Sequence, residues 1–373
     1  MLTVLQFCVD ANTSSGVNCF CTNLNKALNA SGAVKSLIIR DASSLSNLSN
    51  VSNLSNLIIH IHGIWRRQHH LAARWARSNG VPIVWSTHGM TAPWAMRHKW
   101  WKKRLAWWLY QRRDLRRANV IHCTTEMEVE WNQEKVQESG RFVIAPLGVN
   151  EEVQDVREVR EERPFVVLFV GRVHPVKGLE NAIRAMAEIR DSRSLRGSRG
   201  WEGVQLRIVG PDEGGYRRML LALCDKLGLS TNLSSVSDLS NLSNVSNLPS
   251  VLFLGEKHGA ELGAEYSGCD VLVLPSFTEN FGGVVIDALA HGKPVIASRT
   301  TPWKCLADER IGWWVDNSPE CLAKTIAEVM DLPREALREM GERGRTFVSA
   351  NYTWEAVARK MAACYEGLWV NHE

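Results

Sequence analysis

The feature that most restricts the fold is a repeated alternation of short apolar runs with loops and amphipathic segments. Each run has the length of a strand and is followed by a loop and then by a helix-like stretch. This order predicts an α/β protein whose parallel strands are covered by helices on both faces. Ligands of such sheets bind at the carboxyl ends of the strands. The clearest runs are residues 2–9, 57–63, 164–170, 204–209 and 271–275.

One strand–loop–helix unit, residues 271–298, carries the strongest indication of a ligand site. Its loop holds two glycines, which let the backbone approach a ligand closely. The helix begins at about residue 284, and the N–H groups at a helix start favour an anion. Two carboxylates eight residues apart can face the same crevice and accept sugar hydroxyls. The unit is therefore predicted to bind a nucleotide sugar through Glu279, Gly282, Gly283 and Asp287.

Length and composition indicate two domains. A chain of 373 residues can form two cores, and its 45% hydrophobic and 23% charged content is ordinary for a globular protein. The charged segment 151–163 has little apolar periodicity and is interpreted as a linker. It would join an N-terminal domain, residues 1–150, to a C-terminal domain, residues 164–350. The last helix, within 351–373, is expected to cross back to the first domain.

Two near-copies of a Ser-Asn-Leu repeat interrupt this pattern, at 43–56 and 230–248. Their period of three residues matches neither a helix nor a strand. Each copy precedes an apolar run, so both are interpreted as insertions in surface loops, where extra length has a low free-energy cost.

Charge and cysteine content narrow the classes of protein. The net charge of +4 is too small to predict nucleic-acid binding. Nine cysteines without a Cys-x-x-Cys pair fit reduced thiols. The chain shows no signal peptide and no apolar run of the ~20 residues that a membrane span needs. We therefore expect a cytoplasmic protein.

Histidines end two of the predicted strands. His60 and His62 alternate to one face with Trp65 just beyond, but no third ligand at metal-binding spacing is evident. Packing or a polar contact at the strand end is the favoured interpretation for this pair. His88 follows the strand at 81–87, and both a functional histidine and a buried structural one fit that position.

Residues 97–117 combine nine Lys/Arg, one acid, four Trp and a Tyr. The pattern predicts one or two helices with an aromatic side and a basic side. These helices could pack their aromatic rings inward, or lie on an anionic membrane surface with Trp at the headgroup level. Nucleic-acid binding ranks last because no known nucleic-acid motif accompanies the segment.

Two cations follow the strand at 164–170. Arg172 and Lys177 flank a loop that ends in Gly178. Together they could neutralise a diphosphate, although isolated cations of this kind are also common as plain surface charge.

Taken together, these motifs resemble the family-4 (group 1) retaining glycosyltransferases, which have the GT-B fold of two Rossmann-like, doubly wound domains facing a cleft. The similarity covers nearly all of the chain except the two repeats. The N-terminal half is similar to members that build bacterial lipopolysaccharide or exopolysaccharide. The motifs that carry the resemblance are residues 62–65, 87–90, 93–109, 171–178, 209–216, 275–298 and 301–316.

The resemblance implies a role for each matching residue. Arg172 and Lys177 match the pair that holds the donor diphosphate and stabilises the leaving nucleotide. Glu279 matches the acid that contacts the transferred sugar, and His88 matches an N-domain histidine near that sugar. Asp287 stands where the family has a Glu that binds the ribose hydroxyls. Further donor contacts are implied for Gly16, Gly210, Phe281, Gly282 and Gly283, and acceptor contacts for His62, Trp65 and Trp94.

The resemblance also implies partners and chemistry. The co-substrate would be a nucleotide sugar, with no metal ion or other cofactor, which fits the lack of an Asp-x-Asp motif. The acceptor would be a saccharide, lipid-linked in our interpretation, reached by peripheral association of residues 97–117 with the inner membrane. Alternatives are a non-catalytic nucleotide-sugar or membrane-binding protein on the same scaffold, and a soluble enzyme of the sucrose-synthase or epimerase type.

Overall fold

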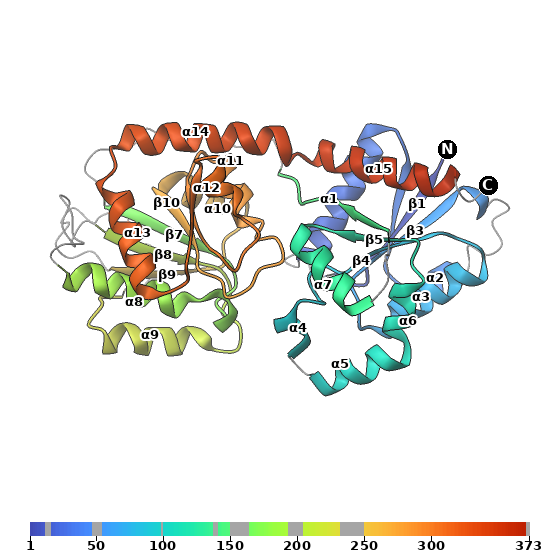
Figure 1. Ribbon diagram of the computed structural model, residues 1–373, viewed down its shortest axis with the longest axis horizontal. Coiled ribbons are helices and arrows are strands. Elements are labelled where there is room, and N and C mark those ends of the chain that lie inside the picture. The colour runs from blue at the N-terminus through green and yellow to red at the C-terminus, as the bar shows by residue number, and fades with distance from the viewer. Residues whose placement is uncertain are drawn as a thin grey trace. The chain divides into compact units, whose positions relative to one another are not determined.

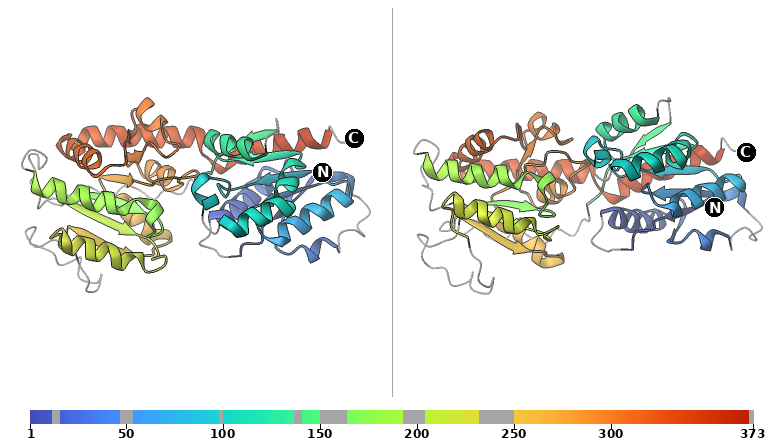
Figure 2. Two further views of the ribbon diagram at one scale, coloured as in Figure 1. Left: turned by 60° about the horizontal axis from the view of Figure 1, so that its bottom comes forward. Right: turned by 90° about the horizontal axis from the view of Figure 1, so that it is seen from below.

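The computed structural model describes residues 1–11, 16–46, 54–97, 100–136, 141–149, 164–192, 204–231 and 250–370. The predicted linker, half of the first repeat and nearly all of the second lie outside these residues. The chain divides into two compact units. Unit 1 is Met1–Gly148 with Tyr352–Glu373, and unit 2 is Val149–Asn351. Each contains one six-stranded sheet with helices on both faces (Figures 1 and 2).

The sheet of unit 1 is parallel throughout, in the order β2-β1-β3-β4-β5-β6. Because β1 pairs with both β2 and β3, the chain changes direction across the sheet between β1 and β3. The loops after these two strands therefore diverge at a position where α/β proteins bind ligands. The strands are β1 (Thr3–Phe7), β2 (Lys35–Ile39), β3 (Leu57–His62), β4 (Ile83–Ser86), β5 (Val120–Cys123) and β6 (Phe142–Ile144).

Helices complete two apolar layers around this sheet. Helices α1 and α15 pack on one face, where Phe20, Leu24 and Tyr365 are buried. Helix α3 and its neighbours cover the other face. The helices of unit 1 are α1 (Gly16–Ser31), α2 (Ser43–Ser46), α3 (Arg67–Ser78), α4 (Pro93–Arg97), α5 (Trp100–Ala106), a π-helix (Trp107–Gln111), α6 (Arg112–Arg116), α7 (Glu126–Val136) and α15 (Trp354–Val370), with a 3-10 turn at Leu54–Asn56.

Unit 2 repeats the design in the order β12-β11-β10-β7-β8-β9, again parallel. Its change of direction falls between β7 and β10. The strands are β7 (Phe165–Val170), β8 (Val204–Val209), β9 (Val251–Gly255), β10 (Val271–Leu274), β11 (Val295–Ser298) and β12 (Gly312–Val315). The helices are α8 (Leu179–Asp191), α9 (Tyr216–Lys226), α10 (Gly259–Gly268), α11 (Val284–Ala290), α12 (Cys305–Asp308), α13 (Pro319–Asp331) and α14 (Arg334–Asn351), with a 3-10 helix at Pro175–Lys177.

The predicted α/β fold with two parallel sheets is confirmed. The start of the first repeat differs from a plain surface insertion, because residues 43–46 form α2 and Leu45 is fully buried against unit 1. Across the residues that the structure describes, no helix combines the length and the apolar character needed to cross a membrane.

Candidate functional site

The loops after β7 and β10 bring a cation and an acid together in unit 2. Lys177 Nζ lies 2.6 Å from Glu279 Oε2, and the two side chains are only 14% and 15% exposed. The Ser276 hydroxyl donates a second hydrogen bond to the same carboxylate oxygen, at 3.1 Å. A charged pair is therefore held at the carboxyl ends of the two strands that flank the change of direction.

Local contacts explain why these loops meet. His174 Nδ1 accepts the Val176 N–H at 3.2 Å and caps the short helix that ends in Lys177. Gly178 then takes a left-handed backbone conformation, with φ of 66°. A Cβ atom on Gly178 would lie 1.9 Å from the Pro275 carbonyl oxygen, so only glycine allows the loops to touch.

The loop after Glu279 is fixed by aromatic packing. Phe281 is buried and meets the Trp303 ring edge to face at 5.1 Å, and the Trp303 indole N–H donates to the Phe281 carbonyl. Gly282 has φ of 79° and lies tightly against the Glu279 side chain. Gly283 immediately precedes α11.

Asp287 lies in α11, partly buried beside Tyr266. Burial raises the pKa of Asp287 to about 7, and the neighbouring Tyr266 side chain counteracts part of this rise. The carboxyl group can therefore exist in either protonation state near neutral pH. The position can accept or donate a hydrogen bond to a hydroxyl.

Arg172, predicted to act with Lys177, has a different partner. Its Nη1 lies 2.5 Å from Glu213 Oε2, and both side chains are about half exposed. The structure thus brings together Lys177 and Glu279, while Arg172 pairs with the loop after β8.

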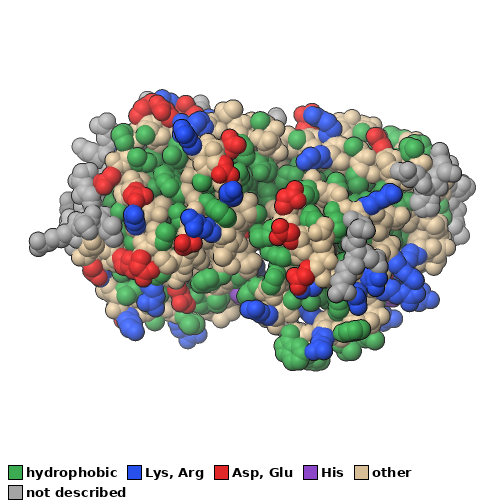
Figure 3. Space-filling view, in the orientation of Figure 1, with side chains coloured by type: hydrophobic (Ala, Val, Ile, Leu, Met, Phe, Trp, Pro, Cys, Tyr) green, Lys and Arg blue, Asp and Glu red, His purple; other side chains and the backbone are tan. Residues whose placement is uncertain are grey.

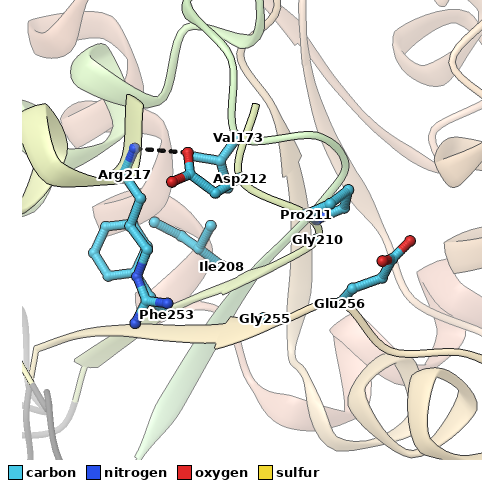
Figure 4. A pocket seen from close by; sticks show the side chains of 9 residues that line it. All are labelled: Val173, Ile208, Gly210, Pro211, Asp212, Arg217, Phe253, Gly255 and Glu256. Atoms are coloured by element: carbon cyan, nitrogen blue, oxygen red, sulfur yellow. Dashed lines mark hydrogen bonds between the residues drawn. The ribbon is translucent and has the colours of Figure 1, made fainter. Parts of the chain in front are cut away.

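A small pocket opens at the carboxyl ends of β8 and β9 (Figure 4). Gly210, predicted to contact the donor, lines it, and a Cβ atom there would lie 1.9 Å from the Gly171 carbonyl oxygen. The Arg217 guanidinium lies 5.4 Å from the centre of the Phe253 ring. The pocket is lined by Val173, Ile208, Gly210, Pro211, Asp212, Arg217, Phe253, Gly255 and Glu256.

In unit 1, His88 follows β4 in a constrained turn. Its φ is 50°, which is uncommon for a residue other than glycine, and Gly89 follows with φ of 70°. The fully buried carboxylate of Glu128 fixes this turn, because it accepts the Gly89 N–H at 2.6 Å and the Thr87 hydroxyl at 2.8 Å. The other oxygen of Glu128 accepts two hydrogen bonds from Thr124.

His88, in the loop after β4, belongs to a cluster of four histidines with His60 and His62 of β3 and His122 of β5. The rings of His60 and His62 lie 4.1 Å apart, and His62 Nδ1 is 3.1 Å from His88 Nε2. His62 is buried and its Nε2 bonds to Gln6, so it supports His88 instead of offering a surface to an acceptor. The sequence patterns did not indicate His122, although it alternates inward on its strand as His60 does.

The other predicted residues of unit 1 are more open. The backbone N–H of Trp65 donates to Gln111 Oε1 at 3.0 Å, and the backbone carbonyl of Trp65 accepts the Tyr110 hydroxyl at 2.6 Å. Trp94 is 41% exposed. Gly16 is the exposed first residue of α1, and the loop before it, residues 12–15, lies outside the described residues.

Proteins of known structure with this fold define the class. The chain resembles sucrose-phosphate synthase from Thermosynechococcus elongatus, with a TM-score of 0.75, 21% identity and full coverage of both chains. It resembles Anabaena Alr3699/HepE in complex with UDP and glucose, with a TM-score of 0.68 and 16% identity over 98% of this chain and 100% of that chain. It resembles WaaG, a glycosyltransferase involved in lipopolysaccharide biosynthesis, with a TM-score of 0.66, 14% identity and the same coverage. The fold is therefore that of the GT-B glycosyltransferases.

Sequence comparison identifies the family. The model described as "Glycosyl transferases group 1" matches residues 150–347, more than half of the chain, and "Glycosyl transferase 4-like domain" matches residues 54–148. The chain belongs to the group 1 glycosyl transferases.

Two curated relatives illustrate the range of the family. A D-inositol 3-phosphate glycosyltransferase from Segniliparus rotundus is 32% identical over 204 residues, which cover 54% of this chain and 39% of that protein. An MMP alpha-(1->4)-mannosyltransferase from Mycolicibacterium hassiacum is 27% identical over 227 residues, or 60% of this chain and 47% of that protein. The matched regions span less than half of each relative.

Proposed function

We propose that the chain transfers a sugar from a nucleotide-sugar donor to a saccharide acceptor, with retention of anomeric configuration. The observation that carries this proposal is the pair of Lys177 and Glu279, held where β7 and β10 diverge. A cation at that point suits the diphosphate, and an acid beside it suits the hydroxyls of the transferred sugar. Family membership supports the same chemistry.

In this proposal, the bond between the sugar and the donor phosphate breaks while the acceptor oxygen bonds to the same carbon. Lys177 and Arg172 stabilise the negative charge that develops on the leaving diphosphate. The departing phosphate takes the proton of the acceptor hydroxyl, so no protein base is needed. Asp287 binds the ribose, and the pocket beside Gly210 takes part of the nucleotide. We expect these residues to act without a metal ion.

We further propose that the acceptor is lipid-linked and that α5 lies on an anionic membrane surface. Trp100, Trp101 and Trp108 are 59%, 58% and 70% exposed, so these three rings do not pack inward, whereas Trp107 packs against the core of unit 1. Lys102 lies close to the Trp101 ring. Figure 3 shows hydrophobic side chains beside Lys and Arg along the edge that α5 occupies in Figure 1. Exposed Trp among cations is typical of proteins that bind the headgroup region.

A donor screen tests the central proposal. Purified protein is incubated with UDP-, GDP- and ADP-sugars and a panel of acceptors, including inositol phosphate, sugar phosphates and a lipid-linked saccharide, and nucleoside diphosphate release is measured. We expect release with one donor that depends on an acceptor and persists in EDTA. Donor binding without turnover on any acceptor would favour the non-catalytic alternative. Full turnover with a soluble sugar phosphate would favour the sucrose-synthase type, and activity restored only by Mg²⁺ or Mn²⁺ would contradict metal independence.

Vesicle flotation tests the membrane proposal separately. The protein is expected to float with vesicles of anionic phosphatidylglycerol at low salt and to stay in solution with phosphatidylcholine alone. Trp101→Glu combined with Trp108→Glu should abolish flotation, while Met219→Glu, a similarly exposed apolar residue of unit 2, should not. Absence of flotation by the unmodified protein at low salt would contradict the proposal.

A further inference from the structure

A continuous chain of hydrogen bonds runs through the core of unit 1 and ends at His88. Its first half begins at the Ala145 carbonyl, which lies 2.8 Å from His122 Nε2. The Ser86 hydroxyl lies 2.6 Å from both His122 Nδ1 and His60 Nε2. His60 Nδ1 then meets the Tyr365 hydroxyl of α15 at 2.7 Å.

The second half continues from Tyr365 through Gln6. The Gln6 side-chain nitrogen faces two oxygens, Ser36 Oγ at 3.2 Å and the Tyr365 hydroxyl at 3.5 Å. Gln6 Oε1 lies 2.7 Å from His62 Nε2, and His62 Nδ1 lies 3.1 Å from His88 Nε2. Within the described part of the chain, no hydrogen bond is made to the remaining nitrogen, His88 Nδ1.

The carbonyl at the start of the chain decides where each proton lies. A carbonyl only accepts, so His122 carries its proton on Nε2 and accepts the Ser86 proton on Nδ1. The Ser86 oxygen must then accept from His60 Nε2, which leaves His60 Nδ1 to accept the proton of Tyr365. Each step follows because a neutral imidazole has one donor and one acceptor nitrogen.

The same assignment of donors and acceptors determines the proton positions from Tyr365 to His88. Because the Tyr365 proton is used at His60, its oxygen can only accept, and the Gln6 amide turns its NH₂ group toward it. Gln6 Oε1 therefore accepts the Nε2 proton of His62. His62 Nδ1 is left as an acceptor, so His88 must donate from Nε2. The lone pair of His88 then lies on Nδ1.

This assignment of donors and acceptors requires that all four imidazoles stay neutral, and their surroundings favour the neutral form. His60, His62 and His122 are buried, and burial lowers the pKa of all four rings, that of His88 to about 3. Phe20 packs against three of the rings, with centroid distances of 5.3 to 5.9 Å. Among the described residues, the acidic group that acts on this cluster is Glu128, through His122, and its carboxylate is held by Thr87, Gly89 and Thr124.

We propose that this chain of hydrogen bonds fixes His88 as its Nε2–H tautomer, so that Nδ1 is left to accept a hydrogen bond from a sugar hydroxyl. The hydroxyl contact rests on the proposed function, whereas the tautomer follows from the geometry of unit 1 alone. Tyr365 and Gln6 are then positioning residues, which act through His88 without touching the sugar.

Nitrogen NMR of the full-length protein labelled with ¹⁵N-histidine tests the tautomer without any need for turnover. Long-range proton–nitrogen spectra at neutral pH distinguish the two neutral tautomers from the imidazolium. We expect His88, assigned by its loss in His88→Ala, to show the Nε2–H pattern. An Nδ1–H or imidazolium pattern for His88 would overturn the proposal.

Removal of the Tyr365 hydroxyl tests whether the chain of hydrogen bonds sets the tautomer of His88. Tyr365→Phe deletes the proton that His60 accepts, so His88 is expected to show a mixture of tautomers. The matched control is Tyr110→Phe, which deletes a hydroxyl of unit 1 that bonds to the Trp65 carbonyl, outside the chain. The control should keep the wild-type pattern of His88. An unchanged His88 pattern in folded Tyr365→Phe would show that the chain does not set the tautomer.

The hydroxyl contact is tested with the donor identified in the screen. Adding this nucleotide sugar should shift the His88 Nδ1 signal, while the corresponding nucleoside diphosphate alone should not. Tyr365→Phe should lower kcat/KM about tenfold, the equivalent of one hydrogen bond. If a nucleotide sugar is turned over but does not shift the His88 Nδ1 signal, the proposed contact between His88 and a sugar hydroxyl is wrong. If no donor is turned over but the Nε2–H pattern is present, the proposed function fails while the tautomer assignment stands.

Discussion

At the scale of single residues, the charge of Lys177 has two effects that mutation can separate. It neutralises a nearly buried carboxylate, Glu279, and in our proposal it stabilises the leaving diphosphate. Lys177→Met keeps the length of the side chain but removes the charge, so kcat should fall by about a hundredfold or more. Lys177→Arg keeps the charge and should retain more activity, although its planar group suits the position less well.

The measurement is steady-state nucleoside diphosphate release, with circular dichroism to verify that each variant is folded. The order of activity should be wild type, Lys177→Arg, then Lys177→Met. Near-normal turnover of folded Lys177→Met would remove this lysine from the diphosphate site.

Asp287 should make the stability of the protein depend on pH. The pKa of this carboxyl is about 7 in the folded protein, above the ordinary value of 3.8. Its contribution to stability is therefore complete below the ordinary value and is lost as pH rises through about 7. The Asp287→Asn side chain does not ionise, so it lacks this loss of stability. The Tm of the variant minus that of the wild type should therefore increase by about 4 °C from about pH 5 to pH 8.

Thermal unfolding of both proteins across this pH range provides the test. Glu261→Gln, a change at an exposed acid of unit 2, is the control and should leave the pH dependence of Tm as in the wild type. Parallel Tm curves for wild type and Asp287→Asn would mean that the carboxyl ionises normally.

At the scale of elements, the site depends on loops that touch, and Gly178 is the residue that permits this. A Cβ atom there would meet a backbone carbonyl oxygen at 1.9 Å, in addition to the strain of a φ of 66°. Gly178→Ala should therefore destabilise unit 2 by roughly 2–4 kcal/mol and reduce turnover strongly.

Gly214 offers a matched control. It has a similar φ, 71°, but no atom lies within 4 Å of the position of its Cβ. Gly214→Ala should cost only the backbone strain, on the order of 1 kcal/mol. Denaturant titrations of both variants give the two values. Equal losses would show that contact with the Pro275 carbonyl is unimportant.

The sequence predicted the elements better than it predicted their side-chain contacts. Apolar runs identified the strands, and the glycines at 178, 282 and 283 marked the loops at the strand ends. The partner of Arg172 could not be predicted, because Glu213 lies in a loop 41 residues further along. The chain of hydrogen bonds through the histidines draws on β1, β3, β4, β5, the loops after β4 and β6, and α15, and no spacing in the sequence relates Gln6 to Tyr365. Such contacts depend on the order of the strands in the sheet, and the periodicity of hydrophobic residues does not reveal that order.

At the scale of the whole molecule, unit 1 is built from both ends of the chain. Helix α15 buries Val357, Met361 and Leu368 against residues of α1 and the sheet. Met361 is fully buried, so Met361→Ala should cost roughly 2–5 kcal/mol of the stability of unit 1. Arg359→Ala, which removes an exposed pair with Glu355, should cost less than about 1 kcal/mol.

Hydrogen exchange followed by mass spectrometry locates the effect. In Met361→Ala, peptides from β1, β3 and α1 should exchange faster, while those from β7, β8 and α8 should keep their wild-type rates. Equal acceleration in both sets would show that the two units unfold as a single cooperative body.

The return of the chain to unit 1 also sets an order of events during synthesis. The segment up to Gly148 leaves the ribosome with one face of its sheet covered by α1 but not by α15, which is still to be translated. Unit 2 emerges in the meantime and can fold by itself, since its residues are contiguous. Tyr365 lies in α15, which is translated after unit 2, so the chain of hydrogen bonds through the histidines stays open until then. A nascent chain that stalls before α15 would thus carry a complete set of donor-loop residues but a His88 whose proton is not yet fixed.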